Sequence, residues 1–145
     1  MVNLQDFRED IALLAEGGLV AIKQGDEENA KKLFDALEII EPKSVTKKMG
    51  YGLIAVHKMD VPEAQKIFKE LFDNDHNNRR AQAFLAFSYM LSLMQKGSYE
   101  EKILALKEGA KHATEALKHA EDASTKQLAQ SILDWQIELN RVEQS

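Results

Sequence analysis

The apolar residues of this chain recur at helical spacing and, over a longer distance, with a period of about 34 residues. Within residues 24–42 they lie three and four positions apart, which places them on one face of an α-helix. The set then returns one period later, since Ala30, Phe34 and Leu37 are followed at the same spacing by Ala64, Phe68 and Leu71. A fixed period of this length is typical of stacked helix–turn–helix units, so the pattern predicts a repeat architecture.

Seven helices are predicted from this periodicity and from the residues that interrupt it. Gly25, Pro42 and Gly97 break the apolar pattern, and proline cannot continue the backbone hydrogen bonds of a helix. The predicted helices span residues 3–23, 27–40, 44–58, 61–72, 79–95, 99–120 and 125–142. The expected N-cap residues are Asp26, Asp60, Ser98 and Ser124.

Two neighbouring glycines, Gly17 and Gly18, lie inside the apolar pattern of the first predicted helix. Each glycine in a helix interior costs about 1 kcal/mol relative to alanine. A reason to keep them there is the close approach of another helix, which a side chain would prevent. The pair therefore predicts a tight helix–helix contact.

The third unit of the repeat is longer than the first two. Ala30–Lys31 is echoed by Ala110–Lys111, which lies about 12 residues, or three helical turns, beyond the position that two periods would give. The last predicted helix has a continuous apolar stripe, as expected for a helix that covers the open end of a stack: Leu128, Ile132, Trp135, Leu139 and Val142.

Composition narrows the classes of function. The net charge of −5 and the pI near 5.4 argue against the basic face that nucleic-acid binding needs. Cysteine is absent, so disulfides and thiolate metal sites are excluded. The N-terminal stretch lacks the features of a secretory signal, and no run of about 18 apolar residues is long enough to span a membrane. We expect a cytoplasmic protein with no nucleic-acid partner and no stable membrane insertion.

The period and the residues that carry it resemble the tetratricopeptide repeat (TPR) family. The matching positions are Leu14, Gly18, Gly25, Ala30, Phe34, Leu37 and Pro42 in the first unit, Gly52, Ala64, Phe68 and Leu71 in the second, and Leu85, Ala86 and Tyr89 in the third. The chain departs from the family at Lys48, where a bulky apolar residue is usual, at His76, where proline is frequent, and in the longer third unit.

The resemblance implies an all-α fold, a right-handed solenoid of helical hairpins in a single domain spanning residues 1–145. It would hold about three TPR-like repeats and a C-terminal capping helix, about seven helices in all. The implied repeats are residues 11–44, 45–78 and 79–122, followed by the capping helix at 124–142.

In TPR proteins the first helices of the repeats line a concave groove where partners usually lie. Carrying that phase over implies a mostly apolar groove: Ala15, Leu19, Ile22, Met49, Leu53, Val56, Ala83, Phe87, Met90, Leu91 and Met94. Methionine adapts to varied side chains, so such a groove suits an amphipathic helix or an apolar peptide. The alternative is that these side chains are already covered, by the chain's own helices or by a second copy in a homodimer.

Few residues suggest chemistry. His112, Glu115 and His119 could be drawn together as metal ligands, but they lie on a charged amphipathic helix without further ligands from a motif. The chain has no glycine-rich phosphate loop, nucleophile elbow or HExxH motif. We therefore expect no metal, no cofactor and no enzymatic activity.

These expectations favour a protein-binding TPR chaperone or adaptor that holds an apolar or amphipathic helix of a partner protein. In size, acidity and lack of cysteine the chain is similar to the TPR-type chaperones of bacterial type III secretion systems, which act in protein transport by shielding needle subunits or translocators before export. The alternative is a homo-oligomeric structural scaffold without a peptide client, joined through the stripe of the last helix.

Overall fold

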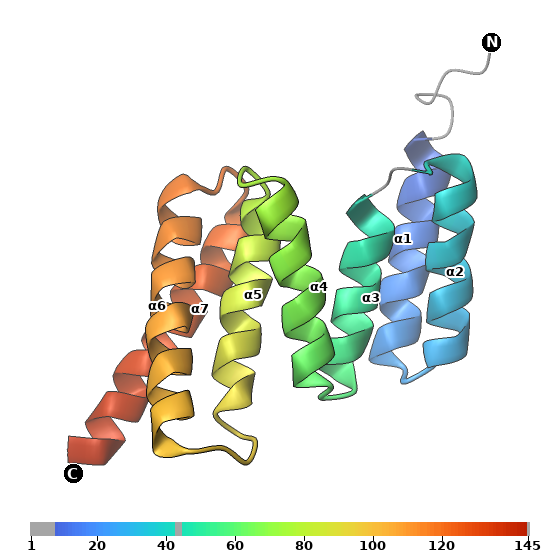
Figure 1. The fold of residues 1–145 in the computed structure, drawn as a ribbon. Helices are drawn as coiled ribbons and strands as arrows, with labels where there is room; N and C mark the ends of the chain where they lie inside the picture. The colour runs from blue at the N-terminus through green and yellow to red at the C-terminus, as the bar shows by residue number, and fades with distance from the viewer. Residues whose placement is uncertain (1–7, 43–44, 145) are drawn as a thin grey trace. The chain divides into compact units, whose positions relative to one another are not determined.

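The computed structural model describes residues 8–42 and 45–144, and the side chains of residues 13–42 and 45–141. Within these ranges the fold is all-α, with seven helices and no strand (Figure 1). The all-helical fold class with about seven helices is therefore confirmed. In chain order the helices are α1 (Arg8–Lys23), α2 (Glu27–Ile40), α3 (Val45–His57), α4 (Val61–Asn74), α5 (Arg79–Ser92), α6 (Tyr99–His119) and α7 (Ala123–Gln144).

The helix bounds follow the local sequence signals closely. Helix α2 spans the predicted residues 27–40. Helix α5 ends at Ser92, three residues before the predicted end, because the following backbone tightens into turns whose hydrogen bonds join residues three apart. The predicted helix starts at Asn3 and Ser44, and the side chain of Val142, lie outside the described residues.

The chain divides into two compact units, Met1–Glu63 and Ala64–Ser145, and the boundary falls early in α4. The first unit holds α1, α2 and α3, and the second holds most of α4 together with α5, α6 and α7. Each unit has its own core. The single domain and the right-handed solenoid stay predictions.

The core of the first unit is built around the ring of Phe34 on α2, which is buried between α1 and α3. A Cβ atom on Gly18 of α1 would lie 2.6 Å from Cζ of the ring, and one on Gly50 of α3 would lie 2.5 Å from its Cδ1. Both distances are far below van der Waals contact, so glycine is required on both sides of the ring. The predicted close approach of a neighbouring helix is confirmed at Gly18.

The turns that follow α1 and α3 repeat each other at the spacing of the sequence period. In each turn the amide of an aspartate, Asp26 or Asp60, donates to the carbonyl five residues earlier at 2.8 Å. The residue before each aspartate has left-handed backbone, with φ of 74° at Gly25 and 58° at Met59. This is the usual closure of a helix C-terminus. The period of the sequence is thus matched by a repeat of the same turn geometry in the backbone.

Helix α6 packs against both α5 and α7 in the second unit (Figure 1). Its buried face consists of small residues three or four positions apart: Ala105, Gly109, Ala113 and Ala116. Small residues let neighbouring helices come close, and a Cβ on Gly109 would lie 3.4 Å from Sδ of Met90 on α5. Helix α6 has 21 residues whereas α2 and α4 have 14 each, so part of the extra length predicted for the third unit lies in this helix.

The start of α7 differs from the prediction, which placed the N-cap at Ser124. Instead, Oδ2 of Asp122 accepts hydrogen bonds from the Thr125 amide at 2.9 Å, the Thr125 hydroxyl at 2.8 Å and the Ser124 hydroxyl at 2.7 Å. A carboxylate can accept several bonds at once, so it displaces the hydroxyl as the cap. Helix α7 consequently begins at Ala123.

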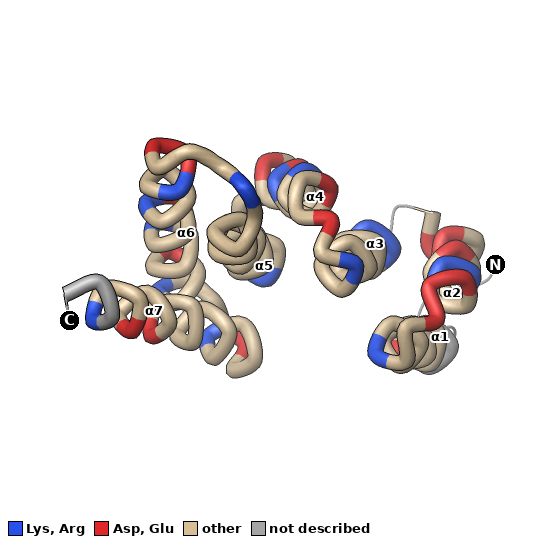
Figure 2. The backbone as a smooth tube through the Cα atoms, turned by 90° about the horizontal axis from the view of Figure 1, so that it is seen from below, with Lys and Arg blue, Asp and Glu red and all other residues tan. Residues whose placement is uncertain are grey.

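Helices α2 and α4 carry charges of both signs (Figure 2). Several charges pair one helical turn apart, including Lys31 with Glu27 at 2.8 Å and Lys69 with Asp73 at 2.9 Å. Exposed pairs of this kind contribute little to stability. The fold is therefore held by the apolar and small-residue contacts described above.

Candidate functional site

The predicted groove residues fall into two sets, one in each unit. Ala15, Leu19, Ile22, Met49, Leu53 and Val56 belong to the first unit, and Ala83, Phe87, Met90, Leu91 and Met94 belong to the second.

In the first unit the structure brings three predicted positions into one apolar cluster. Ile22 is part of the core, and Ala15 and Leu53 pack against that core while half-buried. Met49 and Val56 are also half-buried. Leu19 is 40% exposed, so it is the predicted groove residue of this unit that is most open to a partner.

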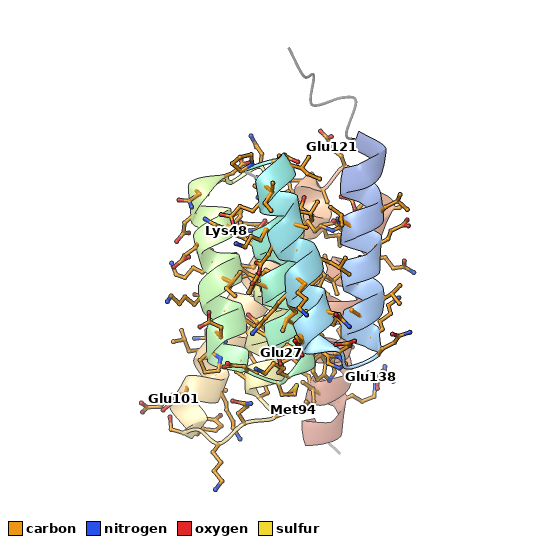
Figure 3. The ribbon with its side chains drawn as sticks, turned by 90° about the vertical axis from the view of Figure 1, so that its right-hand side faces the viewer. Glu27, Lys48, Met94, Glu101, Glu121 and Glu138 are labelled. Carbon is orange, nitrogen blue, oxygen red and sulfur yellow. The ribbon has the colours of Figure 1, made fainter. Side chains whose placement is uncertain are left out.

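In the second unit the chain itself covers most of the predicted positions. Ala83 and Met90 are fully buried, in clusters that contain residues of α6 and α7, and Leu91 is buried as well. Phe87 is half-buried against the same cluster as Met90. Met94 is 61% exposed on the segment that follows α5 (Figure 3). Ala83 and Met90 are therefore covered by the chain's own helices, which is the alternative stated for the predicted groove.

Two further apolar residues of α1 are exposed and were not among the predicted positions. Leu13 is 65% exposed and Val20 is 51% exposed. They are seven residues apart, so they lie two turns apart on one side of the helix. The signal that could have found them is the presence of apolar residues on more than one side of α1.

The candidate metal ligands His112, Glu115 and His119 do not form one metal site in the part of the chain that the structure describes. Nδ1 of His112 lies 3.2 Å from Nε2 of Gln82, and that amide also donates to Glu115 at 2.9 Å. His119 is exposed and lines a separate hollow. Among the described residues, no three histidine, cysteine, aspartate or glutamate side chains come together in a way that could hold a metal ion.

A polar hollow of about 620 Å³ lies where α5 begins, α6 ends and α7 begins. It is lined by Asn77, Asn78, Arg79, Arg80, His119, Glu121 and Asp122. Some of these groups already serve the fold. Nη1 of Arg79 donates to Gln82 at 2.9 Å, and Asp122 caps α7. Hydrogen bonds from the Ser124 hydroxyl and from the Thr125 amide and hydroxyl lower the pKa of Asp122 to about 2. This arrangement points to helix capping rather than to chemistry.

Helices α6 and α7 have 21 and 22 residues, close to the length of about 20 that spans a bilayer, but both carry charged side chains along their length. In the part of the chain that the structure describes, no helix combines the length and the apolar character needed to cross a membrane.

Comparison of the chain with protein-family models, with curated proteins and with solved structures gives no match in any of the three.

Proposed function

We propose that this chain binds an apolar or amphipathic segment of a partner protein, and that the outward sides of α1 form part of the contact. The observation that carries the proposal is the exposure of Leu13, Leu19 and Val20 on a helix whose inner side already packs against α2 and α3. A helix that is apolar on more than one side is usually covered on more than one side. A partner segment is the cover that we propose.

The energetics favour a contact that extends beyond these exposed side chains. Covering one leucine or valine is worth about 1.5–3 kcal/mol. Much of that gain is offset by the cost of association and of ordering the partner. The half-buried Ala15 of α1 and Leu53 of α3, which pack against the same core, support an extension of the contact from α1 onto α3.

The repeated turn supports a TPR-like repeat protein, because Gly25 and Met59 close their helices in the same way at equivalent positions of the sequence period. As a finer proposal, the chain is a TPR-type chaperone or adaptor of a bacterial type III secretion system. Its client would be a needle subunit or a translocator, whose apolar helix needs cover before export.

The alternative, a homo-oligomeric scaffold, was expected to use the apolar stripe of α7. The stripe residues whose side chains the structure describes pack inside the second unit, where Ile132 is in the core and Leu128, Trp135 and Leu139 pack against it. Ile137 is exposed and lies off the stripe. A dimer formed through α7 would therefore have to use the side of Ile137.

The experiment that tests the proposal begins with recovery of the tagged chain from its native host and identification of a protein that co-purifies in near-stoichiometric amount. Binding of that purified partner is then measured for Leu19→Glu. The matched control is Ile39→Glu, which places the same charge at an isoleucine that is 83% exposed on α2. Circular dichroism establishes that both variants fold.

Loss of binding in Leu19→Glu with retention in Ile39→Glu supports the contact on α1. Equal binding by both folded variants contradicts it. Recovery of the chain by itself as a defined dimer favours the scaffold, and the effect of Ile137→Glu on that dimer then tests the side of α7 that it uses.

A further inference from the structure

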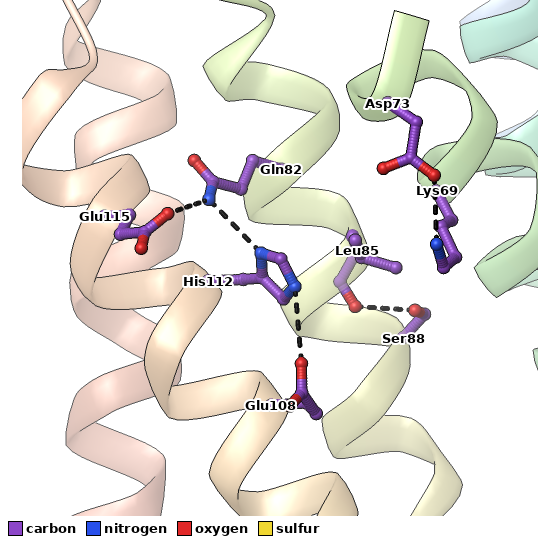
Figure 4. A network of polar contacts seen from close by, with 8 residues as sticks. All are labelled: Lys69, Asp73, Gln82, Leu85, Ser88, Glu108, His112 and Glu115. Atoms are coloured by element: carbon purple, nitrogen blue, oxygen red, sulfur yellow. Dashed lines mark hydrogen bonds and ion pairs between the residues drawn. The ribbon is translucent and has the colours of Figure 1, made fainter. Parts of the chain in front are cut away.

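A buried polar network lies between α5 and α6 in the second unit (Figure 4). At its centre is Gln82 of α5, whose side chain is fully buried. Its Oε1 accepts from Nη1 of Arg79 at 2.9 Å. Its Nε2 lies 2.9 Å from Oε2 of Glu115 and 3.2 Å from Nδ1 of His112, both on α6. The amide thus uses both its oxygen and its nitrogen.

The partners of Gln82 determine where the proton of His112 sits. A guanidinium group can only donate, so the amide oxygen must face Arg79 and the amide nitrogen must face α6. An amide nitrogen also only donates, so Nδ1 of His112 must accept and carry no proton. The neutral ring then has its proton on Nε2, which lies 3.6 Å from Oε2 of Glu108.

His112 is enclosed by aromatic rings from two other helices. Phe72 of α4 meets the imidazole edge to face at 5.7 Å, and Tyr89 of α5 is parallel to it at 6.1 Å between ring centres. Only 14% of the His112 side chain is exposed. The imidazole therefore contacts α4 and α5 as well as its own helix α6. A change in its charge consequently affects the packing of all three helices.

The charged and titratable groups around the ring come from each of these helices. Helix α6 contributes Glu108, Lys111 and Glu115, and helix α5 contributes Arg79 and Tyr89. Helix α4 contributes Lys69 and Asp73, which pair with each other at 2.9 Å. In the turn after α4, His76 stacks on Phe72. Burial is the largest influence and lowers the pKa of His112 below its ordinary value of 6.5. Glu108, Glu115 and Asp73 oppose this effect, and Lys111 adds to it.

We propose that His112 is a proton-operated latch, which holds α6 against α4 and α5 while the imidazole is neutral and loosens this packing when Nδ1 takes a proton. A proton on Nδ1 would point at the N–H groups of Gln82, so two donors would face each other. The amide cannot turn to offer its oxygen, because its nitrogen would then face Arg79 and its oxygen would face the carboxylate of Glu115.

The direction of the pH effect follows from the unprotonated imidazole of the folded state. In the unfolded chain His112 takes a proton near pH 6.5, whereas in the folded chain it does so at lower pH. The stabilising effect of the latch is thus complete above about pH 6.5 and is lost as the pH falls toward the folded-state value. Over this pH range the unfolding equilibrium constant should rise about tenfold for each pH unit by which folding lowers the pKa of His112.

Two measurements test the latch, and the first uses the unaltered chain. NMR titration of the imidazole nitrogens is expected to show His112 with its proton on Nε2 at neutral pH and with a titration midpoint below the ordinary value of about 6.5. A proton on Nδ1 at neutral pH, or a midpoint at or above that value, would overturn the proposal.

The second measurement compares His112→Asn with His119→Asn. The asparagine oxygen at position 112 keeps an acceptor near the position of Nδ1 but cannot take a proton, and His119 is an exposed histidine on the same helix. Urea unfolding is followed by the fluorescence of Trp135, the chain's one tryptophan, which packs against the core of the second unit. Midpoints are recorded at about pH 7.5 and about pH 5.5, on either side of the ordinary histidine pKa.

The wild type and His119→Asn should both lose stability on acidification, and His112→Asn should lose clearly less. An equal loss in all three proteins would overturn the latch. If His112→Asn does not fold, the titration of the unaltered chain decides the question.

Discussion

A Cβ atom on Gly18 would lie 2.6 Å from Cζ of Phe34, so α1 and α2 are in contact through a position that has no room for a methyl group. The ring cannot retreat, because Gly50 of α3 closes its other side in the same manner. One aromatic residue between two glycines thus sets how closely the three helices of the first unit pack.

Gly18→Ala should destabilise the first unit. Alanine improves helix propensity by about 1 kcal/mol, but an added methyl in a packed core costs about 1–3 kcal/mol, and the close contact with Phe34 places the cost at the upper end. We expect a net loss of about 1–2 kcal/mol in the free energy of unfolding, measured by urea titration with circular dichroism. Gly17→Ala is the control, because its Cβ would meet only the flexible end of Leu33 at 3.2 Å. A Gly18→Ala variant as stable as the wild type would contradict the close approach.

Met59→Gly should stabilise the chain. Met59 has φ of 58°, a left-handed conformation that costs a residue with a side chain about 1–2 kcal/mol relative to glycine. The more flexible unfolded state of the glycine variant returns part of this, so a gain of about 0.5–1 kcal/mol is expected. The reciprocal control is Gly25→Ala, where φ is 74° and nothing lies within 4 Å of the added Cβ. Gly25→Ala should lose a similar amount of stability through backbone strain alone. Thermal unfolding checks both variants, because the midpoint should rise for Met59→Gly and fall for Gly25→Ala.

Asp122→Ala should weaken the start of α7 and alter the acid end of the stability profile. The Ser124 hydroxyl and the Thr125 amide and hydroxyl lower the pKa of the Asp122 carboxyl from 3.8 to about 2 in the folded chain. Its contribution to stability is therefore complete above about pH 4 and is lost as the pH falls toward about 2. Because Asp122 is exposed, solvent screening reduces the effect, and we expect a loss of about 0.5–1 kcal/mol at neutral pH.

The measurement for Asp122 is urea unfolding followed by Trp135 fluorescence at about pH 7 and about pH 3. Glu121→Ala removes the neighbouring exposed carboxylate and serves as the control. The stability difference between Asp122→Ala and the wild type should shrink at the lower pH. A difference that stays constant would mean that the Asp122 carboxyl does not contribute through its charge.

Met90 and Met94 should respond very differently to truncation, although both were expected to line one groove. Met90→Ala removes a fully buried side chain from the core of the second unit and should cost about 2–5 kcal/mol. Met94→Ala changes an exposed side chain beyond the end of α5 and should stay within about 0.5 kcal/mol of the wild type. Thermal unfolding of the two variants under the same conditions checks the pair. Similar losses would mean that Met94 is also covered.

Much of the helical organisation could be predicted because it depends on residues close together in the chain. Helix α2 begins after its N-cap, Asp26, whose carboxylate accepts from the Asn29 amide at 3.2 Å, and it ends before Pro42. Where two caps compete, local sequence is less decisive. At α7 the expected Ser124 gave way to Asp122, because one carboxylate oxygen accepts three hydrogen bonds there.

The candidate site could be predicted only in part, because side-chain cover is decided between distant segments. Leu19 is partly exposed, but Leu13 and Val20, which were not among the predicted groove positions, are more exposed still. Periodicity identifies apolar sides of a helix, but it does not say how many of those sides find a neighbour. The structure of the first unit supplies neighbours for one side of α1 through α2 and α3.

By itself the sequence determined the helices, most of their caps and the period of the repeat, since these arise from backbone geometry and contacts within a few residues. Only the tertiary structure decided which side chains of α5 are covered. That helix buries polar Gln82 as completely as apolar Met90, because partners for the amide arrive on α6, 30 and 33 residues later. Burial of apolar surface is non-directional, so an apolar stripe specifies only that a helix face can be covered. The face that is covered is selected by where the next helices pack.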